Sequence, residues 1–76
     1  MNYKKLMWLV GYYEGLVFFK LLYEELKAEG REEMIDTYVK EHKNEVEAGR
    51  VEMDGESYKS GYIIGFNEGY MRLIAE

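Results

Sequence analysis

The sequence predicts an all-α fold, a single domain of three helices, and three observations support this prediction. The chain of 76 residues contains no proline, the residue that most readily interrupts a helix. Its apolar residues recur at steps of three and four positions, which is the period of one helix face. Glycines follow two of these stretches, at Gly30 and Gly49, where they suit the left-handed residue that ends many helices.

The first helix is expected over residues 3–28. Apolar and aromatic side chains occupy nearly every side of it, with Trp8 and Leu22 on the face of its glycines, Val17 on a second and Leu16 on a third. A helix that is apolar all round is normally buried all round, and two other helices of one chain cannot surround it. We therefore expect a homodimer or higher oligomer in which a second copy of the chain covers this helix.

The second helix is expected over residues 31–48 and ends at Gly49. It begins with the letters REE, and acidic side chains in a first turn are favourable at the positive end of the helix dipole. Ile35, Val39 and Val46 mark one apolar face, whereas most other positions are charged. This pattern predicts an amphipathic helix with an acidic outer face.

The third helix is expected over residues 56–75. The segment before it, RVEMDGES, contains the turn signal Asp54-Gly55 and allows a short hairpin. Because an isolated two-stranded hairpin is marginally stable, we expect a loop in which Asp54 or Ser57 caps the helix. No flexible linker separates the helices, so the three form one domain.

Five glycines lie inside the predicted helices at steps of four residues, a spacing that places them on one helix face. They are Gly11 and Gly15 in the first helix and Gly61, Gly65 and Gly69 in the third. Each costs about 0.8–1 kcal/mol relative to alanine, so a compensating gain is expected. Close approach of two backbones is such a gain, and we predict glycine-mediated close packing of the first and third helices.

The two glycine motifs also resemble each other. The stretch LVGYYEG, residues 9–15, aligns with IIGFNEG, residues 63–69. An internal duplication, with the two helices related by a pseudo-twofold axis, would explain the similarity. Chance is the alternative, because small residues four apart beside aromatic residues arise easily in helices.

Composition and charge exclude several classes of function. The net charge of −5 disfavours direct binding of nucleic acid, whose phosphates require lysine and arginine. The absence of cysteine excludes disulfides, zinc–thiolate sites and thiol catalysis, and it is compatible with the cytoplasm, the expected location. Glu14 and Lys20 interrupt the apolar run of the first helix, so we expect a structural helix rather than a membrane span or a signal peptide.

Some residues of the predicted helices suit a ligand site, in which carboxylates flanked by aromatic residues bind a cationic group or act as acid and base. These candidate ligand-binding residues are Glu14, Glu68, His42, Tyr12 and Tyr62. The structural alternative is local pairing, of Glu68 with Arg72 four residues on and of Glu14 with a lysine or a tyrosine hydroxyl.

His42 is the only histidine in the chain. Helical di-metal sites use Glu-x-x-His on more than one helix, whereas this chain has the reverse order, His42 followed by Glu45, once. We therefore expect no metal site and no cofactor, with His42 at the edge of the core and hydrogen-bonded to a tyrosine or a glutamate. The sequence also lacks a phosphate loop, a dinucleotide motif and a nucleophile motif.

These observations favour a small, acidic, non-catalytic interaction protein, an adaptor or inhibitor that binds a macromolecular partner. Its expected partners are a second copy of itself and a basic protein surface. The candidate partner-binding residues are acids of the second helix: Glu32, Glu33, Asp36, Glu41 and Glu45. The alternative is a helical protein that binds a small molecule in a pocket of carboxylates and tyrosines at a helix or subunit junction. A metal-dependent enzyme using the same carboxylates ranks last.

Overall fold

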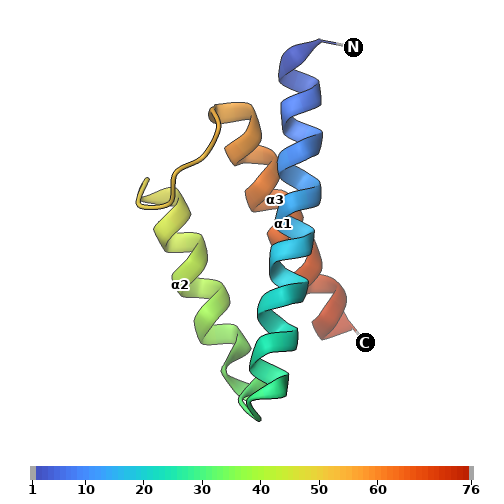
Figure 1. The fold of residues 1–76 in the computed structure, drawn as a ribbon, viewed down its shortest axis with the longest axis vertical. Coiled ribbons are helices and arrows are strands. Elements are labelled where there is room, and N and C mark those ends of the chain that lie inside the picture. The colour runs from blue at the N-terminus through green and yellow to red at the C-terminus, as the bar shows by residue number, and fades with distance from the viewer. Residues whose placement is uncertain (1, 76) are drawn as a thin grey trace.

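The structure, a computed structural model, describes residues 2–75 and confirms the all-helical prediction (Figure 1). Helix α1 spans Tyr3–Ala28, α2 spans Ile35–Glu47 and α3 spans Glu56–Ala75. The first and third helices have the expected bounds. The second differs, because its first turn is a 3-10 helix, η1, over Glu32–Met34. No strand occurs within residues 2–75, so the segment before α3 is a loop.

Helices α1 and α3 run side by side in the same direction (Figure 1). Helix α2, which connects them in the sequence, runs in the opposite direction and lies along one side of the pair. Most of the contacts between helices join α1 to α3. The molecule is elongated, with extents of 42 × 26 × 18 Å. The tightly packed α1–α3 pair is therefore the framework on which every other surface is placed.

The ends of α1 and α2 are closed by the glycines that follow them. Gly30 and Gly49 have φ values of 71° and 77°, a left-handed conformation that glycine adopts without strain. After α1, the backbone N–H of Arg31 donates to the carbonyl oxygen of Leu26 at 2.7 Å, and an equivalent bond follows α2. Both ends are Schellman motifs, which satisfy carbonyl groups that the helix itself leaves unpaired.

Four of the five helical glycines meet the backbone of the opposite helix. Gly11 and Gly15 face the carbonyl oxygens of Tyr58 and Tyr62 in α3. Gly61 and Gly65 face those of Trp8 and Tyr12 in α1. A Cβ atom on any of the four would lie closer than 3.0 Å to a backbone atom of the other helix. Gly69 differs, because the side chain of Phe19 fills the space beside it, 2.9 Å from the position of such a Cβ atom.

These contacts are reciprocal, which gives the helix pair a pseudo-twofold axis. Each of these four glycines faces the carbonyl group of the residue three positions before a glycine of the other helix. Gly11 thus corresponds to Gly61 and Gly15 to Gly65, an offset of 50 residues (61 minus 11 and 65 minus 15). The motif alignment considered from the sequence pairs Gly11 with Gly65 instead, so it is not the relation that the contacts follow.

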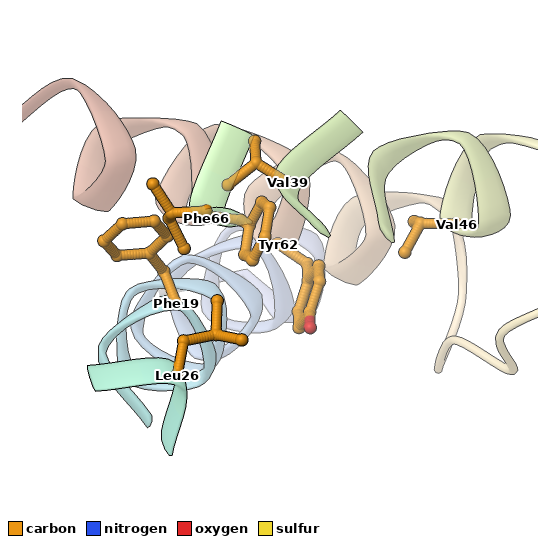
Figure 2. Packing of buried hydrophobic residues seen from close by; sticks show 7 residues of the cluster. Phe19, Leu26, Val39, Val46, Tyr62 and Phe66 are labelled. Carbon is orange, nitrogen blue, oxygen red and sulfur yellow. The ribbon is translucent and has the colours of Figure 1, made fainter. Parts of the chain in front are cut away.

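The core lies where α2 covers the α1–α3 pair (Figure 2). Its buried side chains come from all three helices: Phe19, Leu26, Ile35, Val39, Val46, Tyr62 and Phe66. Phe66 and Val46 are each only 1% exposed. The rings of Phe19 and Phe66 meet edge to face with centroids 5.8 Å apart, a favoured aromatic geometry. The apolar face predicted for α2 is therefore the face that packs inward.

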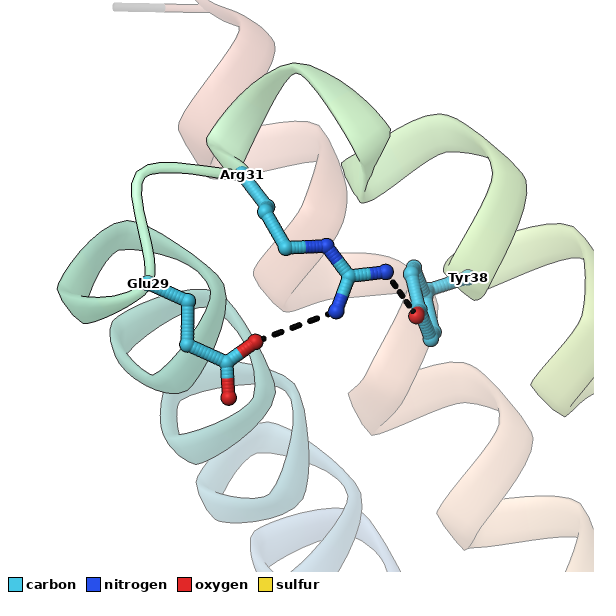
Figure 3. Close-up of polar contacts among 3 residues, drawn as sticks. All are labelled: Glu29, Arg31 and Tyr38. Atoms are coloured by element: carbon cyan, nitrogen blue, oxygen red, sulfur yellow. Dashed lines mark hydrogen bonds and ion pairs between the residues drawn. The ribbon is translucent and has the colours of Figure 1, made fainter.

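An exposed polar cluster joins α1 to α2 at their connection (Figure 3). The Arg31 guanidinium donates to Glu29 Oε1 at 3.1 Å and to the Tyr38 hydroxyl at 2.6 Å. It also lies 5.6 Å from the centre of the Tyr38 ring. These contacts raise the pKa of Arg31, with the Tyr38 hydrogen bond contributing most. Because the groups face solvent, the cluster orients the connection and contributes little stability.

Candidate functional site

Glu14 is paired with a tyrosine, the structural alternative considered from the sequence. Its carboxylate accepts a hydrogen bond from the Tyr58 hydroxyl across the α1–α3 contact. Burial, followed by this hydrogen bond, raises the pKa of Tyr58 to about 12. Tyr58 therefore stays protonated at neutral pH and remains a donor to Glu14. The sequence did not identify Tyr58 as the partner of Glu14. The available signal was its position three residues before Gly61, which matches the position of Trp8 before Gly11.

His42 lies at the edge of the core, between α2 and the helix pair. Its Nε2 atom is 2.8 Å from the Tyr62 hydroxyl, and its ring stacks on Phe18 with centroids 4.4 Å apart. Burial lowers the pKa of His42, and the nearby Glu45 charge opposes this shift in part. Burial also raises the pKa of Tyr62. The two groups thus form a neutral hydrogen-bonded pair at pH 7.

The other candidate ligand residues lie apart from this pair. Glu68 forms an ion pair with Arg72 at 3.2 Å, as the four-residue spacing predicts. Tyr12 stacks on Trp8 with ring centroids 5.4 Å apart. Only Glu14 and Tyr62 line one common hollow, an open surface depression of about 340 Å³. The predicted ligand residues therefore do not converge on a single enclosed pocket.

The described part of the chain, residues 2–75, holds no group of three or more side chains suited to binding a metal ion together. The acidic residues of the second helix are also partly engaged. Asp36 accepts a hydrogen bond from the Tyr70 hydroxyl, and Glu45 pairs with Arg50 at 2.8 Å. Glu32, Glu33 and Glu41 are exposed. Of the predicted partner-binding set, these three present their charges to solvent most openly.

Among the described helices, α1 has the most exposed large apolar side chains. Large side chains on its outer face are exposed, and we call them the α1 stripe: Tyr3, Leu6, Val10, Tyr13, Val17 and Leu21. They follow one another at steps of three or four residues and lie opposite Gly11 and Gly15 on the helix. Tyr13 is 63% exposed and Leu21 59%. The α3 contact thus covers one face of α1 and leaves the opposite apolar face in solvent.

Among the described helices, α1 alone is long and apolar enough to cross a membrane, judged by length and composition. Only 17% of its most apolar window is buried within the molecule. Core helices of soluble proteins and signal sequences meet the same criterion, so the observation indicates an apolar helix and no particular environment for it.

The whole molecule exposes more surface than its mass requires. Its accessible surface is 5320 Å², against roughly 4,900 Å² expected for a compact monomer of this mass. Its radius of gyration is 12.8 Å, against about 11 Å expected for a chain of this length. Both quantities reflect the elongated shape of the molecule.

The structure thus defines a class, a small all-helical domain built on two parallel, closely packed helices and covered on one side by a third. Comparison of the chain with protein-family models, with curated proteins and with solved structures gave no match.

Proposed function

We propose that this chain is a non-catalytic interaction protein that works as a homodimer or higher oligomer, with the α1 stripe as its interface. The exposure of the stripe is the observation that carries the proposal. Isolated apolar side chains are common on protein surfaces, but a continuous row along one helix is typical of an interaction site. A second copy presents the same row, so a twofold interface would bury both at once.

The size of the stripe supports a stable contact. From Tyr3 to Leu21 it extends along roughly 27 Å of helix. Full burial of a large apolar side chain contributes about 1.5–3 kcal/mol. The free energy gained by burying six such side chains from each copy exceeds the lower end of the cost of association, about 4 kcal/mol, even when burial is incomplete. Because these side chains are already exposed in the single chain, self-association requires no change in the fold.

We further propose that the helical glycines mediate the close packing of α1 and α3. At Gly11, Gly15, Gly61 and Gly65, a side chain would collide with the backbone of the opposing helix. Cα–H groups at such contacts also interact favourably with carbonyl oxygens. The glycines would then determine which face of α1 is covered by α3, and so which face remains for a second copy.

For a macromolecular partner, the outer face of α2 with Glu32, Glu33 and Glu41 suits a basic protein surface. Ligand binding or catalysis at Glu14 and His42 has less support. Glu14 and His42 are already hydrogen-bonded to the Tyr58 and Tyr62 hydroxyls. The hollow that Glu14 and Tyr62 line is open to solvent. We therefore favour the interaction protein over the small-molecule binder.

Native mass spectrometry of the wild type and of Tyr13→Glu tests the proposal. We expect an oligomer for the wild type and a monomer with unchanged helical circular dichroism for Tyr13→Glu, because a charge would be buried unpaired in the interface. Thr37→Glu, an exposed substitution of the same charge on α2, should leave the oligomer intact. A wild-type monomer at tens of micromolar would contradict the assembly, and co-sedimentation with lipid vesicles would then test whether the stripe lies on a membrane.

A further inference from the structure

A groove of about 580 Å³ lies between the C-terminal halves of α1 and α3, and no residue of α2 lines it. We call it the α1–α3 groove. Leu16, Phe19, Tyr23 and Leu73 contribute its apolar lining, and the Phe19 side chain fills the space beside Gly69. Val17 belongs both to this groove and to the α1 stripe. The groove is thus an apolar surface on the uncovered side of the helix pair.

The pseudo-twofold relation of α1 and α3 makes this groove equivalent to the surface that binds α2. Helix α2 contacts Phe18 of α1, and Tyr62, Phe66, Asn67 and Tyr70 of α3, and it shares a surface hollow with Leu22 of α1. The offset of 50 residues converts Leu22, Phe66, Asn67 and Tyr70 into Arg72, Leu16, Val17 and Lys20, all of which line the groove. The equivalents of Phe18 and Tyr62 are Glu68 and Tyr12, which lie outside its lining. The same backbone arrangement that holds one helix on its α2 side is therefore repeated, without an occupant from this chain, on the other side.

The charges around the groove indicate the chemistry of an occupant. Lys20, Lys27 and Arg72 line it together with one acid, Glu24, although the whole chain carries a net charge of −5. Arg72 is paired with Glu68, so Lys20 and Lys27 are the cations that face an occupant. On the α2 side, the Tyr70 hydroxyl donates to Asp36 of the bound helix. Lys20 stands at the position equivalent to Tyr70 and offers an ammonium group for the same purpose. A carboxylate placed on the bound helix as Asp36 is on α2 would pair with it.

From this geometry we infer that the α1–α3 groove is a docking site for an acidic amphipathic helix of a partner protein. The apolar face of that helix packs on Leu16, Tyr23 and Leu73, and its acidic flanks meet Lys20 and Lys27. The inference rests on the proposed function, an interaction protein, and names a class of partner for it. It concerns the side of the molecule opposite the acidic face of α2.

Fluorescence anisotropy with two synthetic helical peptides of about 18 residues, roughly 27 Å long, tests the inference. Both carry aliphatic residues at the spacing of Ile35, Val39 and Val46, and the flanking positions are glutamate in one peptide and lysine in the other. We expect the acidic peptide to bind at least about tenfold more tightly, a difference of about 1.4 kcal/mol. The net charge of the chain attracts the basic peptide non-specifically, so this preference would arise from the groove.

Charge reversal at the rim locates the binding. Lys20→Glu and Lys27→Glu should each weaken binding of the acidic peptide about tenfold, without loss of helical circular dichroism, because both side chains are exposed. Lys40→Glu, which makes the same charge change on α2, should leave the affinity unchanged. The inference is overturned if neither peptide binds, if the basic peptide binds better, or if Lys40→Glu weakens binding as much as the rim variants do.

Native mass spectrometry of the peptide complex separates this inference from the assembly proposal. We expect one acidic peptide per chain and an unchanged oligomer number. A monomer that binds the acidic peptide would contradict the assembly through the α1 stripe and leave the groove assignment standing. An oligomer that dissociates when the peptide binds would show that a second copy occupies the groove, and would overturn the assignment to a partner protein.

Discussion

Three tyrosine hydroxyls of α3 form hydrogen bonds with titratable side chains of α1 and α2. The pairs are Tyr58 with Glu14, Tyr62 with His42, and Tyr70 with Asp36. Tyr62 follows Tyr58 by four residues and Tyr70 follows Tyr62 by eight, so the three hydroxyls come from one side of α3, within about 120° of the helix. Within residues 2–75, no buried side-chain polar atom lacks a hydrogen-bond partner. The carboxylates and the histidine that suggested chemistry in the sequence are thus explained by packing.

The burial of His42 predicts that the protein loses stability in mild acid. Its pKa in the folded state lies below the ordinary value of 6.5. As the pH falls through about 6.5 towards the folded pKa, the unfolded chain takes up a proton that the folded chain does not. The free energy of unfolding should therefore fall over this window and become independent of His42 below the folded pKa. Urea unfolding between about pH 7 and 5 measures it.

His42→Gln is the matched control for this pH dependence. The amide cannot titrate, and it keeps a group that can hydrogen-bond to Tyr62. We expect a smaller change in unfolding free energy over the same pH range than in the wild type. The same slope in both proteins would assign the effect to the carboxylates and contradict the prediction for His42.

At the scale of elements, the α1–α3 contact is the unusual feature of the fold. Most helix pairs are separated by interlocking side chains at 8–10 Å between axes. Here each helix presents glycines to carbonyl groups of the other, in a reciprocal arrangement. The sequence spacing of the glycines predicted which helices pair. It did not predict the offset of 50 residues, because small residues at steps of four allow several registers.

Gly65→Ala is expected to lower the free energy of unfolding by about 1–2 kcal/mol. Helix propensity alone favours alanine by about 1 kcal/mol, but the new Cβ atom would meet the backbone of Tyr12. Backbone cannot move aside as a side chain can, and overpacking of this kind costs about 1–3 kcal/mol or more. Urea unfolding followed by the fluorescence of Trp8, which lies on α1 at this contact, measures the change.

Gly69→Ala provides the comparison within the same helix. Its Cβ atom would lie 2.9 Å from Cδ2 of Phe19, so a side chain rather than a backbone would have to shift. We expect a smaller loss than for Gly65→Ala, because the gain in helix propensity is the same and the obstacle is softer. If Gly65→Ala instead stabilises the protein by about 1 kcal/mol, close backbone approach at this position is not required.

The whole molecule has a small core beside a long exposed apolar face. Its fully buried aliphatic and aromatic residues come mainly from the contact of α2 with the helix pair. In α1, the largest helix, only Phe19 and Leu26 are large side chains that become buried. A domain of this size has little stability in reserve. Assembly through the α1 stripe would therefore contribute to the stability of the fold as well as to its function.

Thermal stability should accordingly depend on protein concentration. When folding is coupled to association, mass action raises the midpoint of unfolding, Tm, as the concentration increases. We expect Tm to rise with each tenfold increase for the wild type and to be constant for Val10→Glu, whose new charge lies in the stripe. Differential scanning calorimetry over two decades of concentration measures this. A constant Tm for the wild type would indicate that the monomer folds and unfolds alone.

Sequence by itself determined what depends on neighbours along the chain. Helix period and the absence of proline predicted α1 and α3 to their ends, and Gly30 and Gly49 predicted where the first two helices stop. The sequence did not predict that the second helix begins with a 3-10 turn, Glu32–Met34, before α2. The pairing of Glu68 with Arg72 also followed from their spacing, since residues four apart in a helix are neighbours.

Tertiary structure alone decided the contacts between residues far apart in the chain. The sequence allowed Glu14 and His42 a tyrosine partner but did not select Tyr58 or Tyr62, since several tyrosines met the same condition. It showed that α1 is apolar on almost every side, but not which side α3 and α2 leave uncovered. The α1 stripe and the α1–α3 groove therefore exist only once the helices are paired, because exposure is a property of the packed chain.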